Sequence, residues 1–124
     1  MSGDFVLTFE RAGLRLGLAG ERIADVAPDC PVQPVPGAPA GVAGVVLERG
    51  RLLTVIDVDR QLGIVTSGDE DTYLVRLRPP LAHVALRVAA DIHLEPAASS
   101  AVEVLDLDGL VDDLERAIAH HRGG

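Results

Sequence analysis

Cysteine is nearly absent from this chain of 124 residues, and Cys30 is the one example. A single cysteine excludes an internal disulfide and the paired spacings from which zinc sites are built. A reactive thiolate needs an electropositive setting with a base nearby, whereas the acidic residues Asp25 and Asp29 precede Cys30. We therefore expect Cys30 to be an ordinary loop or packing residue.

Lysine is missing altogether, so all 11 basic residues are arginine, against 19 acidic residues. The resulting net charge of −8 opposes binding to a phosphate backbone, which requires a basic face. No arginine-rich segment carries the interleaved aromatic residues on which single-stranded bases stack. We therefore expect no nucleic-acid partner.

Long apolar runs are missing too. No stretch approaches the roughly 20 apolar residues of a membrane-spanning helix. The opening residues, MSGDFVLTFERAG, carry charges too early for a signal peptide. These absences predict no membrane insertion and a cytoplasmic location.

Aliphatic residues, by contrast, are abundant. Hydrophobic residues make up 48% of the chain and aromatic residues 2%, so the core must consist of Val, Leu, Ile and Ala. A chain of this length can bury such a core without disulfides or metal. Because no internal repeat or linker interrupts the pattern, we predict a single domain over residues 1–124.

Short apolar segments punctuated by glycine, proline and polar turns predict a mainly β fold. The predicted strands cover residues 5–9, 14–18, 44–47, 52–58, 72–77, 82–88 and 102–107. Residues 19–26 fit either a short helical turn or the start of another strand. Residues 28–39 hold five of the eight prolines and predict an extended surface connector. Short strands at near-regular spacing are typical of one small barrel or a pair of barrels.

Only the C-terminal end is predicted to be helical. Asp108 is in position to cap its start, and Leu110, Leu114 and Ile118 form one apolar face. We expect this face to cover the core, because a small β domain needs protection for its strands.

Acidic residues provide few candidates for catalysis. Asp57 follows an apolar run and is a candidate catalytic acid or metal ligand; alternatively, it caps the turn over residues 58–62. We favour the cap because no second carboxylate lies at a spacing typical of a catalytic pair. Asp106 and Asp108 face one side in an alternating pattern and come closest to such a pair, but we expect Asp108 to cap the helix and Asp106 to be solvated.

Histidines and serines add no recognisable centre. His120 and His121 are adjacent in the predicted helix, point in different directions and lack a third ligand. His83 is a candidate phosphoacceptor or general base, although a half-buried strand histidine is more often a hydrogen-bonded core residue. No nucleophile motif or phosphate-binding loop is present. We predict that the protein is not an enzyme and uses no cofactor or metal.

The most informative segment is residues 34–63, PVPGAPAGVAGVVLERGRLLTVIDVDRQLG. Two apolar runs on either side of Arg49 and Gly50 predict a β-hairpin with a charged tip. A guanidinium at such a turn has no packing role and presents a planar fork to a partner carboxylate or carbonyl. The alternative is an internal ion pair of Arg49 with Glu48, Asp57 or a neighbouring loop.

The order of motifs in this chain resembles that of CheW-like domains, the adaptors of bacterial chemosensory arrays. Residues 23–26 are similar to the family's Val-x-Glu-Ile segment, and residues 36–39 and 42–46 to its Pro-x-x-Pro and Gly-Val-Ile steps. Arg49 and Gly50 match half of its Asn-Leu-Arg-Gly motif. Residues 53–58 are similar to Leu-Pro-Val-Ile-Asp-Leu, with Thr54 in place of proline.

The resemblance implies two small packed β-barrels, followed here by a C-terminal helix. The second barrel is expected to be abbreviated, because residue 94 is followed almost directly by the predicted strand 102–107. The resemblance also implies a scaffold that joins the cytoplasmic tip of a chemoreceptor (a methyl-accepting chemotaxis protein) to the regulatory domain of a CheA-type histidine kinase. In this family the first barrel mainly engages the kinase, and receptor tips use surfaces near the barrel junction.

The connector adds a second candidate surface, because Val32, Val35, Pro36 and Pro39 form an apolar strip that is either a simple crossing or a docking site. The predicted partner-binding residues are Arg49, Glu48, Gly50, Val35, Pro36, Val46 and Asp57.

Three alternatives remain open. A one-sided relative of the adaptors would bind only receptor or only kinase. A β-barrel ligand-binding or enzymatic domain would have a deep pocket lined by convergent polar groups. A structural protein outside chemotaxis would self-associate through strand edges.

Overall fold

Strands dominate the computed structural model, which describes residues 5–65, 71–89, 91–97 and 102–123, with the side chains of the last helix described as far as Arg116. The strands are β1 (Phe5–Arg11), β2 (Leu14–Ala19), β3 (Ile23–Pro28), β4 (Val42–Glu48), β5 (Arg51–Asp57), β6 (Thr72–Leu77), β7 (Val84–Ala89), β8 (His93–Pro96) and β9 (Glu103–Val104). The helical segments are η1 (Gly20–Arg22), α1 (Val58–Gln61) and α2 (Leu107–Gly123). The mainly β class with a C-terminal helix is confirmed, and residues 19–26 contain both a helical turn and a strand.

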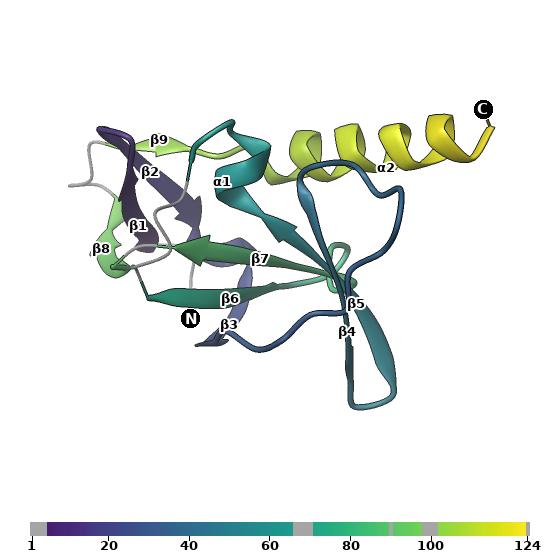
Figure 1. Cartoon of the computed structure of the whole chain (residues 1–124). Coiled ribbons are helices and arrows are strands. Elements are labelled where there is room, and N and C mark those ends of the chain that lie inside the picture. Colours follow the sequence, from purple (N-terminus) through teal and green to yellow (C-terminus); the bar gives the residue numbers. More distant parts are fainter. Residues whose placement is uncertain (1–4, 66–70, 90, 98–101, 124) are drawn as a thin grey trace.

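The strands form two sheets (Figure 1). Sheet A has the order β8-β1-β2-β9, and sheet B has the order β3-β6-β7-β5-β4. The predicted closed barrels are replaced by open sheets among the described strands. Closure requires the two edge strands of a sheet to pair with each other along their length, but among the described strands β8 does not pair with β9, and β3 does not pair with β4. The two shortest described strands, β8 and β9, lie at the edges of sheet A, and the abbreviated second barrel stays a prediction.

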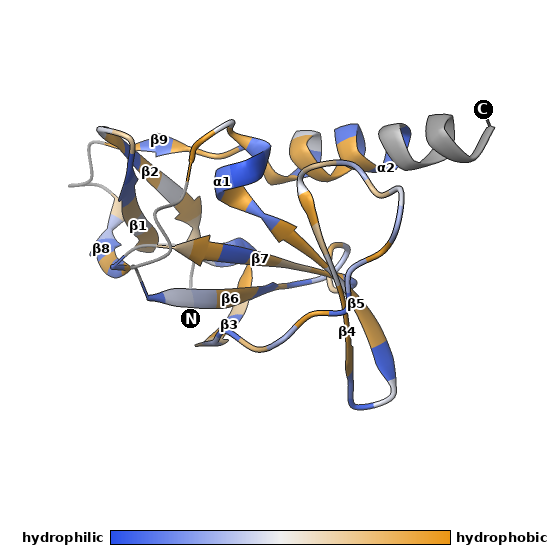
Figure 2. Ribbon diagram, in the orientation of Figure 1, coloured by the Kyte–Doolittle hydropathy of each residue, from blue (hydrophilic) through white to orange (hydrophobic). Residues whose placement is uncertain are grey.

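A continuous aliphatic core joins the two sheets. Its largest fully buried side chains lie on strands of both sheets and include Leu7, Phe9, Leu18, Ile56 and Leu86. The first turns of α2 complete this core with Leu107, Val111 and Leu114. Figure 2 shows apolar residues along β7, in the core, and polar residues at the turn between β4 and β5.

The start of α2 corrects the sequence prediction. The capping residue is Asp106, whose Oδ1 accepts a hydrogen bond from the backbone N–H of Gly109 at 3.1 Å. Asp108 lies within the first turn and instead forms an ion pair with Arg22 at 2.8 Å. The helix begins at Leu107, so the predicted strand over residues 102–107 is reduced to β9.

The buried face of α2 is rotated from the predicted face, which contained Leu110, Leu114 and Ile118. Leu107, Val111 and Leu114 are buried, whereas Leu110 is only half-buried. The side chain of Ile118 lies outside the described residues. The face covers the core, as expected from an aliphatic stripe at helical spacing. None of the described helices is long and apolar enough to span a membrane.

A buried ion pair fastens sheet A to the end of β5. The Nε and Nη2 of Arg11 on β1 donate to the two carboxylate oxygens of Asp59 on α1, at 2.9 and 2.6 Å. The side chains of Arg11 and Asp59 are 8% and 2% exposed. Removing one partner of such a pair leaves an uncompensated buried charge, which costs about 3–5 kcal/mol. This contact is therefore part of the structural framework.

Candidate partner-binding surface

The β4–β5 hairpin continues beyond the end of its neighbour in sheet B. Parallel pairing of β5 with β7 begins at Thr54 and Val84, whereas antiparallel pairing of β4 with β5 extends to Glu48 and Arg51. Within the described part of the chain, the residues nearest the turn therefore have only the opposite hairpin strand as a backbone partner. Figure 1 shows this end of the hairpin projecting from the rest of the fold.

The turn itself is a two-residue connection. Arg49 and Gly50 both have positive φ angles, 51° and 76°. Positive φ at both central positions defines the type I′ turn, whose twist matches the twist of the flanking strands. Arginine is sterically disfavoured in this conformation, so backbone geometry alone does not explain Arg49.

The two faces of the hairpin end have different chemistry. Leu47 pairs with Leu52 across the strands, and their side chains are 71% and 64% exposed. Glu48 pairs with Arg51 and, because side chains alternate along a strand, lies on the opposite face. One face is therefore an exposed aliphatic pair, and the other is charged.

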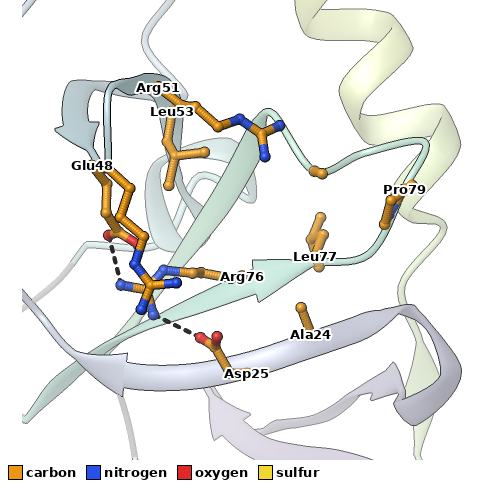
Figure 3. Close-up of a pocket in the computed structure, with 10 residues that line it drawn as sticks. Ala24, Asp25, Glu48, Arg51, Leu53, Arg76, Leu77 and Pro79 are labelled. Carbon is orange, nitrogen blue, oxygen red and sulfur yellow. Dashed lines mark hydrogen bonds and ion pairs between the residues drawn. The ribbon is translucent and has the colours of Figure 1, made fainter.

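Glu48 is held in a network on the charged face. Nη2 of Arg76 on β6 donates to Glu48, and its Nη1 donates to Asp25 on β3, both at 2.6 Å. The hydrogen bond to Glu48, and then that to Asp25, raise the pKa of Arg76 above its ordinary value. Figure 3 shows the Arg76 guanidinium between the two carboxylates. This network ties the hairpin to the strands on the far side of sheet B.

Arg49 and Arg51 differ from the other arginines. Side chains are described for ten of the 11 arginines, Arg122 being the exception. Seven of the ten form an ion pair with a carboxylate, and Arg78 donates to the carbonyl of Ile23. Arg49 and Arg51 have no hydrogen bond or ion pair to any described residue. The predicted internal ion pair of Arg49 is therefore not formed within the part of the chain that the structure describes.

A cavity of about 350 Å³ lies at the base of the projecting hairpin. One wall is the hairpin, another is formed by β3 and β6, and the loop before β7 completes it. The lining residues are Ala24, Asp25, Glu48, Arg49, Arg51, Leu53, Arg76, Leu77, Pro79 and Ala82. Figure 3 shows the side chain of Arg51 on the hairpin side of this space and Pro79 on the opposite side. Charged groups thus converge on a cavity that the sequence did not indicate.

The predicted residues of the connector are separated from the hairpin tip. Val35 and Pro36 are exposed, but Val32 is half-buried against the small cluster formed by Ala43, Val55 and Leu74. Pro39 is half-buried as well, so the predicted apolar strip is reduced to its central part. The connector hydrogen-bonds to β4 through Gln33 and Val45 at 2.9 Å, which explains why it follows the sheet.

Two further residues predicted to bind a partner have structural roles instead. Val46 is half-buried and packs against the same small cluster. Asp57 caps α1, because its Oδ1 accepts a hydrogen bond from the N–H of Arg60 at 3.2 Å. The cap is thus confirmed, at the opposite end of β5 from Arg51. Six residues of extended chain separate the two positions by roughly 20 Å.

The remaining candidates do not form a catalytic centre. His83 is exposed, precedes β7 and lies 3.2 Å from Glu115, so the prediction of a half-buried strand histidine is wrong. Cys30 packs against the small cluster as a half-buried free thiol, which confirms the packing role. The side chains of His120 and His121 lie outside the described residues. Among the residues that the structure describes, no group of His, Cys, Asp and Glu is arranged to hold a metal.

Sequence reasoning identified the turn but missed most of its surroundings. Arg76 and Asp25 are 51 residues apart in sequence, and only the β3–β6 pairing brings them together. The shared face of Leu47 and Leu52 could have been predicted from the sequence. Each residue lies two positions from the centre pair of a two-residue turn, and this equal spacing places both side chains on one face of the hairpin.

Comparison with known proteins agrees with this architecture. The sequence model of the CheW-like domain family matches residues 6–95. The structure is similar to that of the scaffolding protein TtCheW from Thermoanaerobacter tengcongensis, with a TM-score of 0.66 and 22% sequence identity. That similarity covers 82% of this chain and 67% of TtCheW, and at this identity it shows a shared fold. No curated protein sequence matches the chain.

Proposed function

We propose, since this chain belongs to the CheW-like domain family, that it is a non-enzymatic adaptor of a bacterial chemosensory array. It binds the cytoplasmic tip of a chemoreceptor and the regulatory domain of a CheA-type histidine kinase at the same time. The whole chain, residues 1–124, acts as one domain, and its output is the assembly it brings about.

The projecting end of the β4–β5 hairpin carries this proposal. It combines an exposed aliphatic pair, Leu47 and Leu52, with two arginines that have no partner among the described residues, Arg49 and Arg51. Protein-binding surfaces typically combine exposed apolar side chains with arginine, which is enriched at the centre of such interfaces. The hairpin end has this composition, because its two guanidinium groups form no ion pair with a described residue. A surface of this kind fits a docking partner with acidic side chains.

The other predicted residues take different roles in the proposal. Glu48 positions the hairpin through Arg76, and Gly50 provides the turn. Val46 packs beneath the hairpin and Asp57 caps α1, and neither contacts a partner directly. Val35 and Pro36 lie on the exposed part of the connector and contribute to a separate contact. We assign the hairpin surface to the kinase and the region between the two sheets to the receptor.

Two titrations test the proposal. The purified chain is titrated with the regulatory domain of the kinase and, separately, with a peptide or trimer that contains the receptor tip. A three-component mixture is then analysed by size-exclusion chromatography. The proposal predicts binding in both titrations and a complex that contains all three components. Absence of binding in both titrations would contradict it.

A second candidate is a one-sided modulator that binds only one of the two proteins. The abbreviated edge of sheet A favours it, because β9 contributes only two paired residues. Binding to a single partner in the same titrations would select this candidate. Self-association through strand edges would instead appear as an apparent mass that rises with protein concentration.

A further inference from the structure

The cavity at the base of the hairpin occupies a gap in sheet B. The strand that separates β5 from β6 is β7, and it begins opposite Thr54 on β5. Closer to the hairpin turn, no described strand lies between β5 and β6. Arg51 and Leu53 on the hairpin therefore face Leu77 on β6 across the cavity. The loop that leads to β7, including Pro79 and Ala82, closes one side. The cavity is thus a direct consequence of where β7 begins.

The charges around this cavity are unbalanced. Three guanidinium groups, those of Arg49, Arg51 and Arg76, line it together with the carboxylates of Glu48 and Asp25. Both carboxylates are already bonded to Arg76. The local excess of one positive charge therefore resides on Arg49 and Arg51, in a chain whose net charge is −8. A single negative charge would balance the cavity, whereas a doubly charged phosphate would leave it with an excess negative charge.

The donors near the cavity differ in how accessible they are. Nε of Arg76 is buried and has no hydrogen-bond partner among the described residues. A buried donor without a partner costs about 1–3 kcal/mol, but this atom is closed off from the cavity, so the donors open to an acceptor there are the exposed guanidinium groups of Arg49 and Arg51. Carboxylates accept two parallel hydrogen bonds from a guanidinium, which makes them the matching acceptor.

The apolar part of the lining determines what can carry the carboxylate. Leu53, Leu77 and Pro79 offer aliphatic surface between the arginines and the opposite wall. The volume of about 350 Å³ lies near the lower end of the range for ligand sites. It is larger than one short side chain, so a side chain with methylene groups below its charge fits inside it together with part of the flanking partner chain.

We propose that this cavity binds one glutamate side chain of the docking protein. Its carboxylate is held by Arg51 and Arg49, and its methylene groups pack on Leu53 and Leu77. This inference rests on the proposed function, because the glutamate belongs to the protein that docks on the hairpin. It adds a specific chemical requirement for that partner, which the aliphatic pair alone would not impose.

Nuclear magnetic resonance tests the cavity without the partner. The ¹⁵N-labelled chain is titrated with N-acetylglutamate amide and, as a matched neutral control, with N-acetylglutamine amide. We expect the Nε–Hε resonances of Arg51 and Arg49 to shift with the first compound and to shift much less with the second. Equal shifts with both compounds, or no shift with either, would overturn the proposal.

A second experiment uses the kinase regulatory domain and three variants. Arg51→Gln should weaken its binding about tenfold or more, the loss expected for hydrogen bonds to a charged group. Arg51→Lys, which keeps the charge but loses the fork, should give an intermediate loss. Arg116→Gln makes the same charge change on the exposed surface of α2 and should leave the affinity within about twofold.

The outcomes separate the two proposals. If the wild-type chain binds neither kinase nor receptor, the proposed function fails, and the glutamate titration still decides whether the cavity recognises a carboxylate. If the kinase binds and Arg51→Gln has the affinity of the wild type, the glutamate site is wrong while the adaptor function stands.

Discussion

Two arginine–carboxylate groups lie near opposite ends of β5, and they have different roles. At one end, Arg11 and Asp59 form a buried pair in which Nε and Nη2 both reach the carboxylate. At the other end, Arg76 donates to two carboxylates, while Arg49 and Arg51 find no partner among the described residues. Both groups combine arginine with acidic side chains. Burial and hydrogen-bond balance distinguish the structural group from the one suited to binding.

The largest effect is expected from breaking the buried group. Asp59→Ala leaves the Arg11 guanidinium buried without its carboxylate, so the free energy of unfolding should fall by about 3–5 kcal/mol. Urea denaturation followed by circular dichroism measures the change. The double variant Arg11→Met/Asp59→Leu should recover much of the loss, because no buried charge remains. A cost below about 1 kcal/mol for Asp59→Ala would show that this pair is not structural.

This pair also marks a limit of sequence reasoning. Arg11 and Asp59 are 48 residues apart, and nothing in the local pattern of either residue indicates that the two meet. The β4–β5 hairpin, by contrast, was predictable because its turn and alternation are local. Local competition explains the error at Asp108, since two acidic residues stand near the start of α2 and only Asp106 is placed to accept from Gly109.

The hairpin end allows the geometry of the turn to be separated from its charge. Asparagine accepts positive φ more readily than arginine and is preferred before glycine in type I′ turns. Arg49→Asn should therefore raise the free energy of unfolding by roughly 0.5–1 kcal/mol. It should at the same time weaken binding of the kinase regulatory domain several-fold, because the guanidinium is lost.

For Arg49→Asn, thermal denaturation measures the change in stability, and calorimetric titration measures the change in affinity for the kinase regulatory domain. A variant that gains stability and loses affinity would show that Arg49 is retained for binding. Unchanged affinity would mean that the guanidinium contributes nothing to docking, and unchanged stability would mean that the turn tolerates arginine without strain.

A smaller effect is expected at the cap of α1. Asp57→Ala removes the acceptor for the N–H of Arg60 and should lower the free energy of unfolding by about 1 kcal/mol. Asp57→Asn retains an acceptor oxygen and should cost less. Neither change should alter kinase affinity, because Asp57 lies at the far end of β5. Chemical denaturation and one titration per variant check both statements, and a loss of affinity at normal stability would place Asp57 in the interface after all.

The smallest effect concerns pH and the exposed pair of Arg22 and Asp108. Hydrogen bonds from Arg22 lower the pKa of Asp108 below its ordinary value of 3.8. A depressed folded-state pKa contributes stability above the ordinary value, and this contribution is lost as pH falls through the folded-state pKa. The effect is therefore confined to pH values below about 4.

Carbon-detected magnetic resonance titration of the Asp108 carboxylate should show this depression in the wild type. In Arg22→Gln the pKa should return to its ordinary range. An identical pKa in both proteins would show that the ion pair is not maintained in solution.

The contrast between the two ends of β5 is tested most directly by charge reversal at the hairpin turn. Calorimetric titration of the kinase regulatory domain is carried out with the wild type, Arg49→Glu and the surface control Arg116→Glu. If the unpaired arginines form the docking surface, Arg49→Glu weakens binding at least about tenfold, and Arg116→Glu leaves it within about twofold. If Arg49→Glu binds as tightly as the wild type, the hairpin end is not the kinase-binding surface.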